Sequence, residues 1–121
     1  MDPHFDGVIW KTHTAELRRR LARPFPPFCV IDVRWRGDYD QGHIPGALNI
    51  LPENIKSLPP GATERTEIFV VAEDPEDPAM RQASLALRAL GAHRVVELTD
   101  GMREWKRAGG PLEKSAGTKA A

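Results

Sequence analysis

The sequence predicts an α/β fold with a central, mainly parallel sheet of about five strands and helices on both faces. Two near-continuous apolar runs, Phe28 to Val33 and Ile68 to Ala72, are typical of parallel strands that are covered on both sides. Segments with helical spacing of apolar residues alternate with these runs. A chain of 121 residues can bury its own core, so we expect one domain over residues 1–113 and a flexible polar tail over 114–121.

The N-terminal part is expected to add a strand and a helix. Val8 to Lys11 is a short apolar patch, which we interpret as an edge strand. A helix then runs to about Ala22, and Thr12 or Thr14 can cap it because a threonine hydroxyl accepts from a free amide in the first turn. Prolines end this helix before the first core strand begins.

The remainder of the chain continues the alternation. Residues 42–50 predict a turn and a short strand, followed by a proline-rich surface connection. Pro78 suits the first turn of a helix, and Gly91 can end that helix in a left-handed conformation. A further strand is expected at Val95 to Leu98, and a last short helix around Trp105.

Composition excludes several classes of function. The chain has 17 basic and 17 acidic residues and no net charge, which argues against a strong attraction to nucleic acid or an anionic membrane. We see neither an apolar run long enough to span a membrane nor a signal peptide, so a cytoplasmic location is expected. One cysteine cannot form an internal disulfide, and His4, His13 and His93 lack metal-ligand spacing, so we expect no metal and no other cofactor.

Short motifs lie at the ends of the predicted elements. Asp-Val-Arg ends the first core strand, an acidic-aromatic pair follows at Asp38 and Tyr39, and Gly-His-Ile-Pro-Gly-Ala spans residues 42–47. A glycine-rich turn, a tryptophan and a Gly-Gly-Pro run lie near the C-terminus. In this order, and over nearly the whole chain, the motifs resemble the rhodanese-like domain family. The matching residues are Asp32, Arg34, Gly42, His43, Pro45, Gly46, Gly101 and Trp105.

We interpret these matching residues as scaffold rather than as ligand contacts. Asp32 and Arg34 can bond each other and the next loop at the end of a strand. His43 can bond backbone groups that its tight turn exposes, which we favour over a catalytic or metal-binding role. Trp105 suits packing on an amphipathic helix, and Trp35 carries no motif.

The loop after the second core strand departs from the family pattern. The resemblance implies that this strand ends in a nucleophilic cysteine in active relatives, and that the loop amides cradle an anion. Strand alignment puts Ala72 at the cysteine position, whereas counting back from Gly91 suggests Asp74. The loop contains no cysteine; its residues are Ala72, Glu73, Asp74, Pro75, Glu76, Asp77, Pro78, Ala79, Met80 and Arg81.

The composition of this loop is also unsuited to binding an anion. Pro75 and Pro78 each remove an amide donor. Four carboxylates at positions 73–77 repel thiosulfate, persulfide donors and phosphate, and Arg81 is the one cation that we expect to oppose them. We therefore expect a catalytically inactive domain that binds a protein or ligand. The acidic stretch 73–77 is either a contact surface for an Arg- or Lys-rich or metal-containing partner, or simply a solvated loop.

An enzyme of the same fold is the alternative. It would be a sulfurtransferase that uses Cys29, or an activity built on loop carboxylates such as Asp74. Cys29 lies near the start of a core strand and thus roughly 10 Å or more from its carboxyl end, at about 3.3 Å per residue. Ligands of open parallel sheets bind beyond that end, and a cysteine in an apolar run usually acts as a small buried hydrophobic residue.

Overall fold

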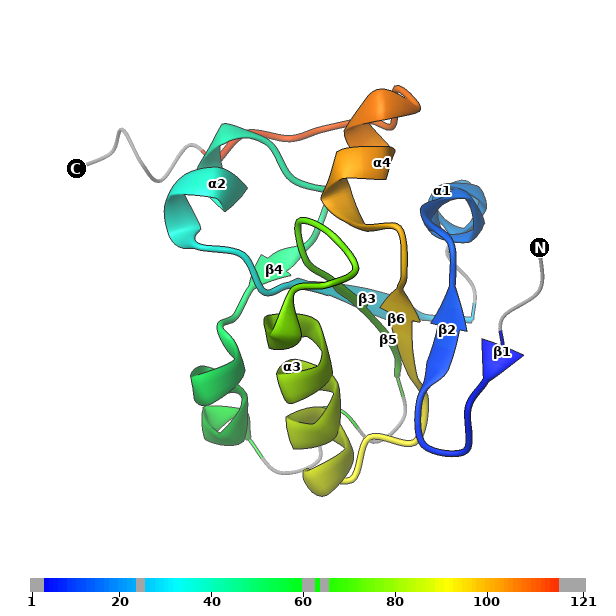
Figure 1. Ribbon diagram of the computed structural model, residues 1–121, viewed down its shortest axis with the longest axis vertical. Helices are drawn as coiled ribbons and strands as arrows, with labels where there is room; N and C mark the ends of the chain where they lie inside the picture. The colour runs from blue at the N-terminus through cyan, green and yellow to red at the C-terminus, as the bar shows by residue number, and fades with distance from the viewer. Residues whose placement is uncertain (1–3, 24–25, 60–62, 64–65, 116–121) are drawn as a thin grey trace.

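A six-stranded sheet forms the centre of the computed structural model, which describes residues 4–23, 26–59, 63 and 66–115 (Figure 1). The strands are β1 (His4–Phe5), β2 (Trp10–Thr12), β3 (Phe28–Asp32), β4 (Leu48–Asn49), β5 (Glu67–Val71) and β6 (Val95–Leu98). Their order is β1-β2-β6-β5-β3-β4; β1 pairs antiparallel with β2, and all other pairs are parallel. The predicted α/β fold class, with a five-stranded parallel sheet, is confirmed.

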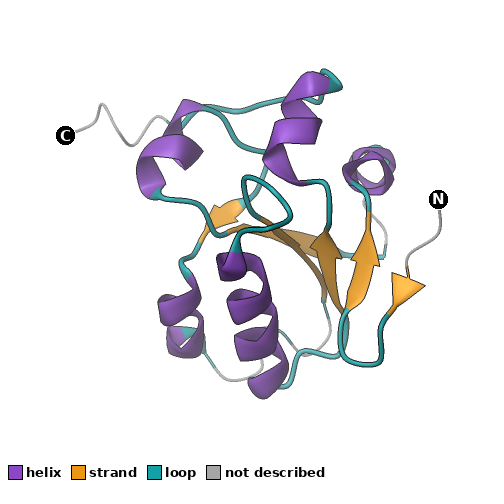
Figure 2. Ribbon diagram, viewed as in Figure 1, coloured by secondary structure: helices purple, strands orange, loops and turns teal. Residues whose placement is uncertain are grey.

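Helices cover both faces of the sheet (Figure 2). They are α1 (Thr14–Leu21), α2 (Arg36–Gln41), the 3-10 helix η1 (Pro52–Ser57), α3 (Pro78–Ala89) and α4 (Gly101–Arg107). Alternate residues of β3 point to opposite faces: Ile31 packs in the core layer under α3 and η1, and Val30 in the layer under α1 and α4. No helix of the described residues is long and apolar enough to cross a membrane.

The predicted edge strand is not at the edge. β2 covers Trp10–Thr12 and lies between β1 and β6, because the short β1 turns back and pairs with it. Pro78 begins α3 as predicted, and Gly91 follows its end with φ +100°. The helix α2 was not predicted; it begins at Arg36, shortly after β3 ends at Asp32. Positions 60 and 61 of the predicted surface connection lie outside the described residues, as do 116–121 of the predicted tail. The Ser115 amide, within the predicted tail, donates to the Asp40 carbonyl at 3.1 Å.

The predicted cap of α1 is wrong, because the cap comes from a distant segment. His13 occupies the N-cap position and makes no capping bond with its side chain. Instead, the carboxylate of Asp100 accepts from the Thr14 amide at 2.8 Å and from the Thr14 hydroxyl at 3.0 Å. This carboxylate therefore satisfies a free amide at the start of the helix and joins α1 to the turn that precedes α4.

The start of α4 also fixes the loop after β5. The Met102 amide donates to the Ala72 carbonyl at 2.9 Å, and the Arg103 amide to the Glu73 carbonyl at 3.0 Å. Gly101 has φ +71°, and a Cβ atom there would lie 2.6 Å from the Glu73 carbonyl oxygen. Only glycine allows this close approach of α4 to the loop without strain.

We predict that Gly101→Ala lowers the free energy of unfolding by about 2–4 kcal/mol, since it combines a left-handed conformation with a clash against backbone. Gly109→Ala is the matched control, because Gly109 has φ +77° but no atom lies within 4 Å of the position that an added methyl group would occupy. It should cost only about 1 kcal/mol. Urea unfolding measures both; equal costs would contradict the packing of α4 on the loop.

Candidate functional site

The candidate site lies at the carboxyl ends of β3 and β5. These strands are neighbours, but the chain leaves β3 toward β4 on one side and leaves β5 toward β6 on the other. The helices that follow the two strands also lie on opposite faces of the sheet: α2 follows β3, and α3 follows β5. Ligands of open parallel sheets bind at such a reversal, because the two loops separate there and leave a crevice.

A buried ion pair between Asp32 and Arg34 organises this end of the sheet. Arg34 Nη2 lies 2.9 Å from Asp32 Oδ2 and Arg34 Nε lies 3.0 Å from Oδ1, with side-chain exposures of 2% for Arg34 and 0% for Asp32. The bond predicted from the sequence is therefore present. Burial alone lowers the pKa of Arg34, but the hydrogen bonds and charge of Asp32 outweigh it and raise that pKa above its ordinary value.

The same guanidinium connects three segments of chain. Arg34 Nη2 donates to the Gly42 carbonyl at 2.8 Å, and Nη1 reaches Glu73 Oε1 at 3.3 Å. Asn49 donates to the carbonyls of Asp32 and Arg34 at 3.0 and 2.8 Å, which fastens β4 to the same strand end. The ion pair thus positions the glycine turn and the loop after β5 relative to β3.

His43 is held inside the glycine turn. Its Nδ1 lies 2.8 Å from the Tyr39 carbonyl, and its ring stacks on Tyr39 with 3.8 Å between ring centroids. Its backbone pairs with Glu113, and the Glu113 carboxylate accepts from the Gly46 amide at 3.0 Å. Trp105 lies elsewhere, 1% exposed, and donates to the Pro111 carbonyl at 2.8 Å. Neither His43 nor Trp105 lines the crevice.

In the loop after β5, backbone amides donate hydrogen bonds to acidic residues of the same loop. Asp74 Oδ1 accepts from the Glu76 amide at 3.1 Å, and the Asp74 carbonyl accepts from the Asp77 amide at 3.2 Å. Asp77 Oδ1 accepts from the Ala79 amide at 2.9 Å and so caps α3. The Glu76 and Ala79 amides are thus bonded to carboxylates of the chain itself and are not free to face an anion at the start of this helix.

The cations that pair with the loop carboxylates are Arg34 and Arg103, not the predicted Arg81. Arg81 was expected to oppose the loop carboxylates, and this is wrong: it turns toward β6 and the β1–β2 turn, where it pairs with Glu97 at 3.0 Å and Asp6 at 3.3 Å. Arg34 pairs with Glu73, and Arg103 pairs with Asp74 at 3.4 Å. The role of Arg103 has no local signal in the sequence, because it depends on how α4 packs on the loop.

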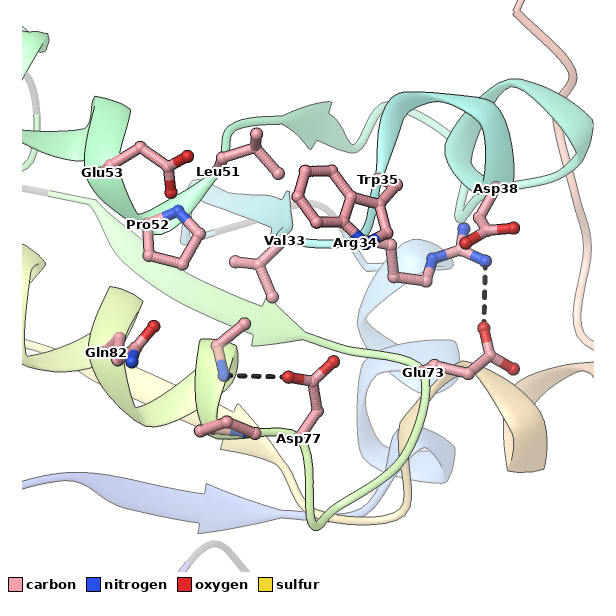
Figure 3. Close-up of a pocket in the computed structure, with 12 residues that line it drawn as sticks. Val33, Arg34, Trp35, Asp38, Leu51, Pro52, Glu53, Glu73, Asp77 and Gln82 are labelled. Atoms are coloured by element: carbon pink, nitrogen blue, oxygen red, sulfur yellow. Dashed lines mark hydrogen bonds and ion pairs between the residues drawn. The ribbon is translucent and has the colours of Figure 1, made fainter.

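A cleft of about 320 Å³ lies beside this loop (Figure 3). The segment after β3, the start of η1 and the start of α3 form its walls. Trp35 stands at its rim with 71% of the residue exposed. Sequence reasoning missed Trp35, although a large aromatic residue directly after a strand end was the available signal. The lining residues are Val33, Arg34, Trp35, Asp38, Leu51, Pro52, Glu53, Glu73, Asp77, Pro78, Ala79 and Gln82.

Comparison with known proteins agrees with this architecture. A family model described as the Rhodanese-like domain matches residues 13–108. The chain belongs to this family. Its relatives include the uncharacterized protein YibN of Escherichia coli strain K12, 32% identical over 69% of this chain and 59% of YibN. The HTH-type transcriptional regulator Rv0324 of Mycobacterium tuberculosis is 33% identical over 84% of this chain and 44% of Rv0324.

A crystal structure of the Alr3790 protein from Anabaena superimposes on this rhodanese-like domain with a TM-score of 0.75. The two are 32% identical, and the match covers 90% of this chain and 86% of that one. By contrast, the chain spans 59% of YibN and 44% of Rv0324, which are longer proteins. Within the described part of the chain, no group of three or more His, Cys, Asp or Glu residues could hold a metal ion.

Cys29 of the rhodanese-like domain lies far from the cleft. It is the second residue of β3 and pairs with Ile68, near the amino ends of both strands. Its side chain is half-buried rather than fully covered, because β4 pairs only with Ile31 and Asp32 and leaves this part of β3 at an edge. Burial raises the pKa of the Cys29 thiol above its ordinary value, so the reactive thiolate is scarce at neutral pH.

We predict that iodoacetamide alkylates Cys29 several-fold more slowly in the native chain at pH 8 than in the unfolded chain. The raised pKa has a further consequence: the native rate should keep rising at pH values where the alkylation rate of the unfolded chain has already levelled. Mass spectrometry of timed samples, taken across neutral to strongly alkaline pH, measures this. Equal rates and equal pH profiles would show that Cys29 is not held in a desolvated position.

Proposed function

We propose that this rhodanese-like domain lacks sulfurtransferase activity and acts as a module that binds a protein partner. The observation that carries the proposal is that acidic residues of the loop occupy its hydrogen-bond donors and cations. The Glu76 and Ala79 amides bond to the carboxylates of Asp74 and Asp77. The guanidinium groups of Arg34 and Arg103 pair with Glu73 and Asp74. No cysteine stands at the carboxyl ends of the strands, where the family resemblance places the nucleophile.

An anionic sulfur donor would meet charge repulsion at this loop. It would have to displace carboxylates that are already bonded, and the Glu76 carboxylate is close by. Like charges a few ångströms apart cost on the order of 1 kcal/mol or more each at an effective dielectric near 20. Ala72, the position given by strand alignment, is 0% exposed, and its carbonyl is bonded to the Met102 amide. The position therefore offers neither a thiol nor an open approach.

The alternative is an enzyme that uses Cys29 or the loop carboxylates. Cys29 lies toward the other end of β3, and the hollow of about 370 Å³ that it lines includes Phe28 and Pro45 but no residue of the loop after β5. The Asp74 carboxylate is engaged by the Glu76 amide and by Arg103. The relative Rv0324 supports a binding role. It is named as a transcriptional regulator, and part of it is similar to this chain.

We predict that the chain forms no thiocyanate above background from thiosulfate and cyanide, because no thiolate faces an anion site. An active rhodanese serves as the positive control, and Cys29→Ser as the matched variant. Cyanide-dependent turnover that disappears in Cys29→Ser would overturn the proposal in favour of a cysteine enzyme. Turnover that survives in Cys29→Ser but disappears in Asp74→Asn would favour chemistry on the loop carboxylates.

A further inference from the structure

The cleft combines apolar walls with an exposed indole. Val33, Pro52 and Ala79 contribute apolar surface from three different segments, and Trp35 stands at the rim (Figure 3). Among the large hydrophobic residues that the structure describes as exposed, Trp35 has the greatest exposure, at 71%. Single exposed apolar residues are common, but an exposed indole that continues into an apolar cleft is typical of a binding surface.

The charges of the cleft are unbalanced. Four carboxylates line it, those of Asp38, Glu53, Glu73 and Asp77, against the single guanidinium of Arg34. That guanidinium is already neutralised by Asp32 and also pairs with Glu73. In the described part of the chain, Asp38 and Glu53 have no ion-pair or hydrogen-bonding partner for their side chains. An occupant with a positive charge would therefore complement the cleft, and an anionic occupant would be repelled.

We infer that this cleft binds an arginine side chain from a basic segment of the partner protein, an inference that rests on the proposed binding role. The guanidinium group is planar and weakly hydrated, so it can stack on the Trp35 indole while it bonds to carboxylates at the rim. Its three methylene groups suit the apolar walls. A volume of about 320 Å³ is small for a ligand pocket and is appropriate for one long side chain.

Other occupants fit the cleft less well. An uncharged apolar segment would cover carboxylates without pairing them, and burying an unpaired charge is costly. A lysine would satisfy one carboxylate but would lose the planar stacking and the two-pronged hydrogen bonding that a guanidinium provides. Small probe molecules can measure these differences, because one probe can keep the shape of arginine without its charge and another can keep the charge without the planar shape.

The test is an NMR titration of the full ¹⁵N-labelled chain with N-acetyl-arginine amide. We expect saturable shifts of the Trp35 indole and of the Val33 and Ala79 amides, with a dissociation constant on the order of 1 mM at low salt. N-acetyl-citrulline amide has the same shape without the charge and should bind about 10-fold more weakly. N-acetyl-lysine amide should bind about 3-fold more weakly than the arginine probe.

Variants locate the binding and provide matched controls. Trp35→Ala should weaken arginine binding about 5-fold or more, followed through the two amides, and Glu53→Gln about 3-fold. Glu76→Gln removes a carboxylate of the neighbouring loop that does not line the cleft, and Phe5→Ala removes an exposed ring on β1, so both should bind normally. Proton spectra of each variant establish that it is folded.

Two results would overturn the arginine inference: no saturable shift with the arginine probe, or equal binding of the citrulline probe. In the second case Trp35-dependent binding would show an apolar occupant and leave the proposed binding role intact. A loss of binding in Glu76→Gln equal to that in Glu53→Gln would also overturn it, because the attraction would then be a general effect of charge. Failure of the proposed function is a separate result, since it requires thiocyanate formation by the same unmodified chain.

Discussion

The buried ion pair of Asp32 and Arg34 is the interaction on which the carboxyl end of this sheet depends. Both side chains are almost entirely shielded from water, so each charge is stable there only because the other is present. Removal of one partner from such a pair typically costs about 3–5 kcal/mol, because the remaining charge is left buried and unpaired. Arg34 also holds the Gly42 turn and Glu73, so the geometry of two loops follows from this one pair.

In the proposed function, the loop after β5 gives the scaffold of the rhodanese-like family a binding role. The family model covers residues 13–108, a range that includes the strands, turns and Gly101 that position the loop. The loop itself places carboxylates against Arg34, Arg103 and the Ala79 amide at the start of α3. In the proposed function, carboxylates of the chain itself stand where the family resemblance places a bound anion. Fold membership alone therefore does not establish the activity.

Features that depend on local sequence could be predicted, and those that depend on tertiary packing could not. The apolar runs indicated β3 and β5, and Pro78 marked the first residue of α3, because each signal lies within the element itself. The cap of α1 was missed because Asp100 lies 86 residues from Thr14. The same holds for the site. The bond between Asp32 and Arg34 was expected because the residues are neighbours in sequence, whereas the direction of Arg81 is set by β6 and the β1–β2 turn.

The most direct measurement is the pKa of a thiol placed in the loop. The central claim is that the loop is filled and acidic, so that adding a cysteine is not enough to restore an anion site. In Ala72→Cys and, separately, Asp74→Cys, thiolate absorbance against pH should give a pKa at or above the unperturbed value of about 8.5, with no thiosulfate turnover. Replacement of residues 72–80 by a short loop that begins with cysteine and contains glycine and arginine should lower this pKa and permit turnover. A pKa well below the unperturbed value with ready turnover in either single substitution would contradict the account, because the native loop would then be a working anion cradle.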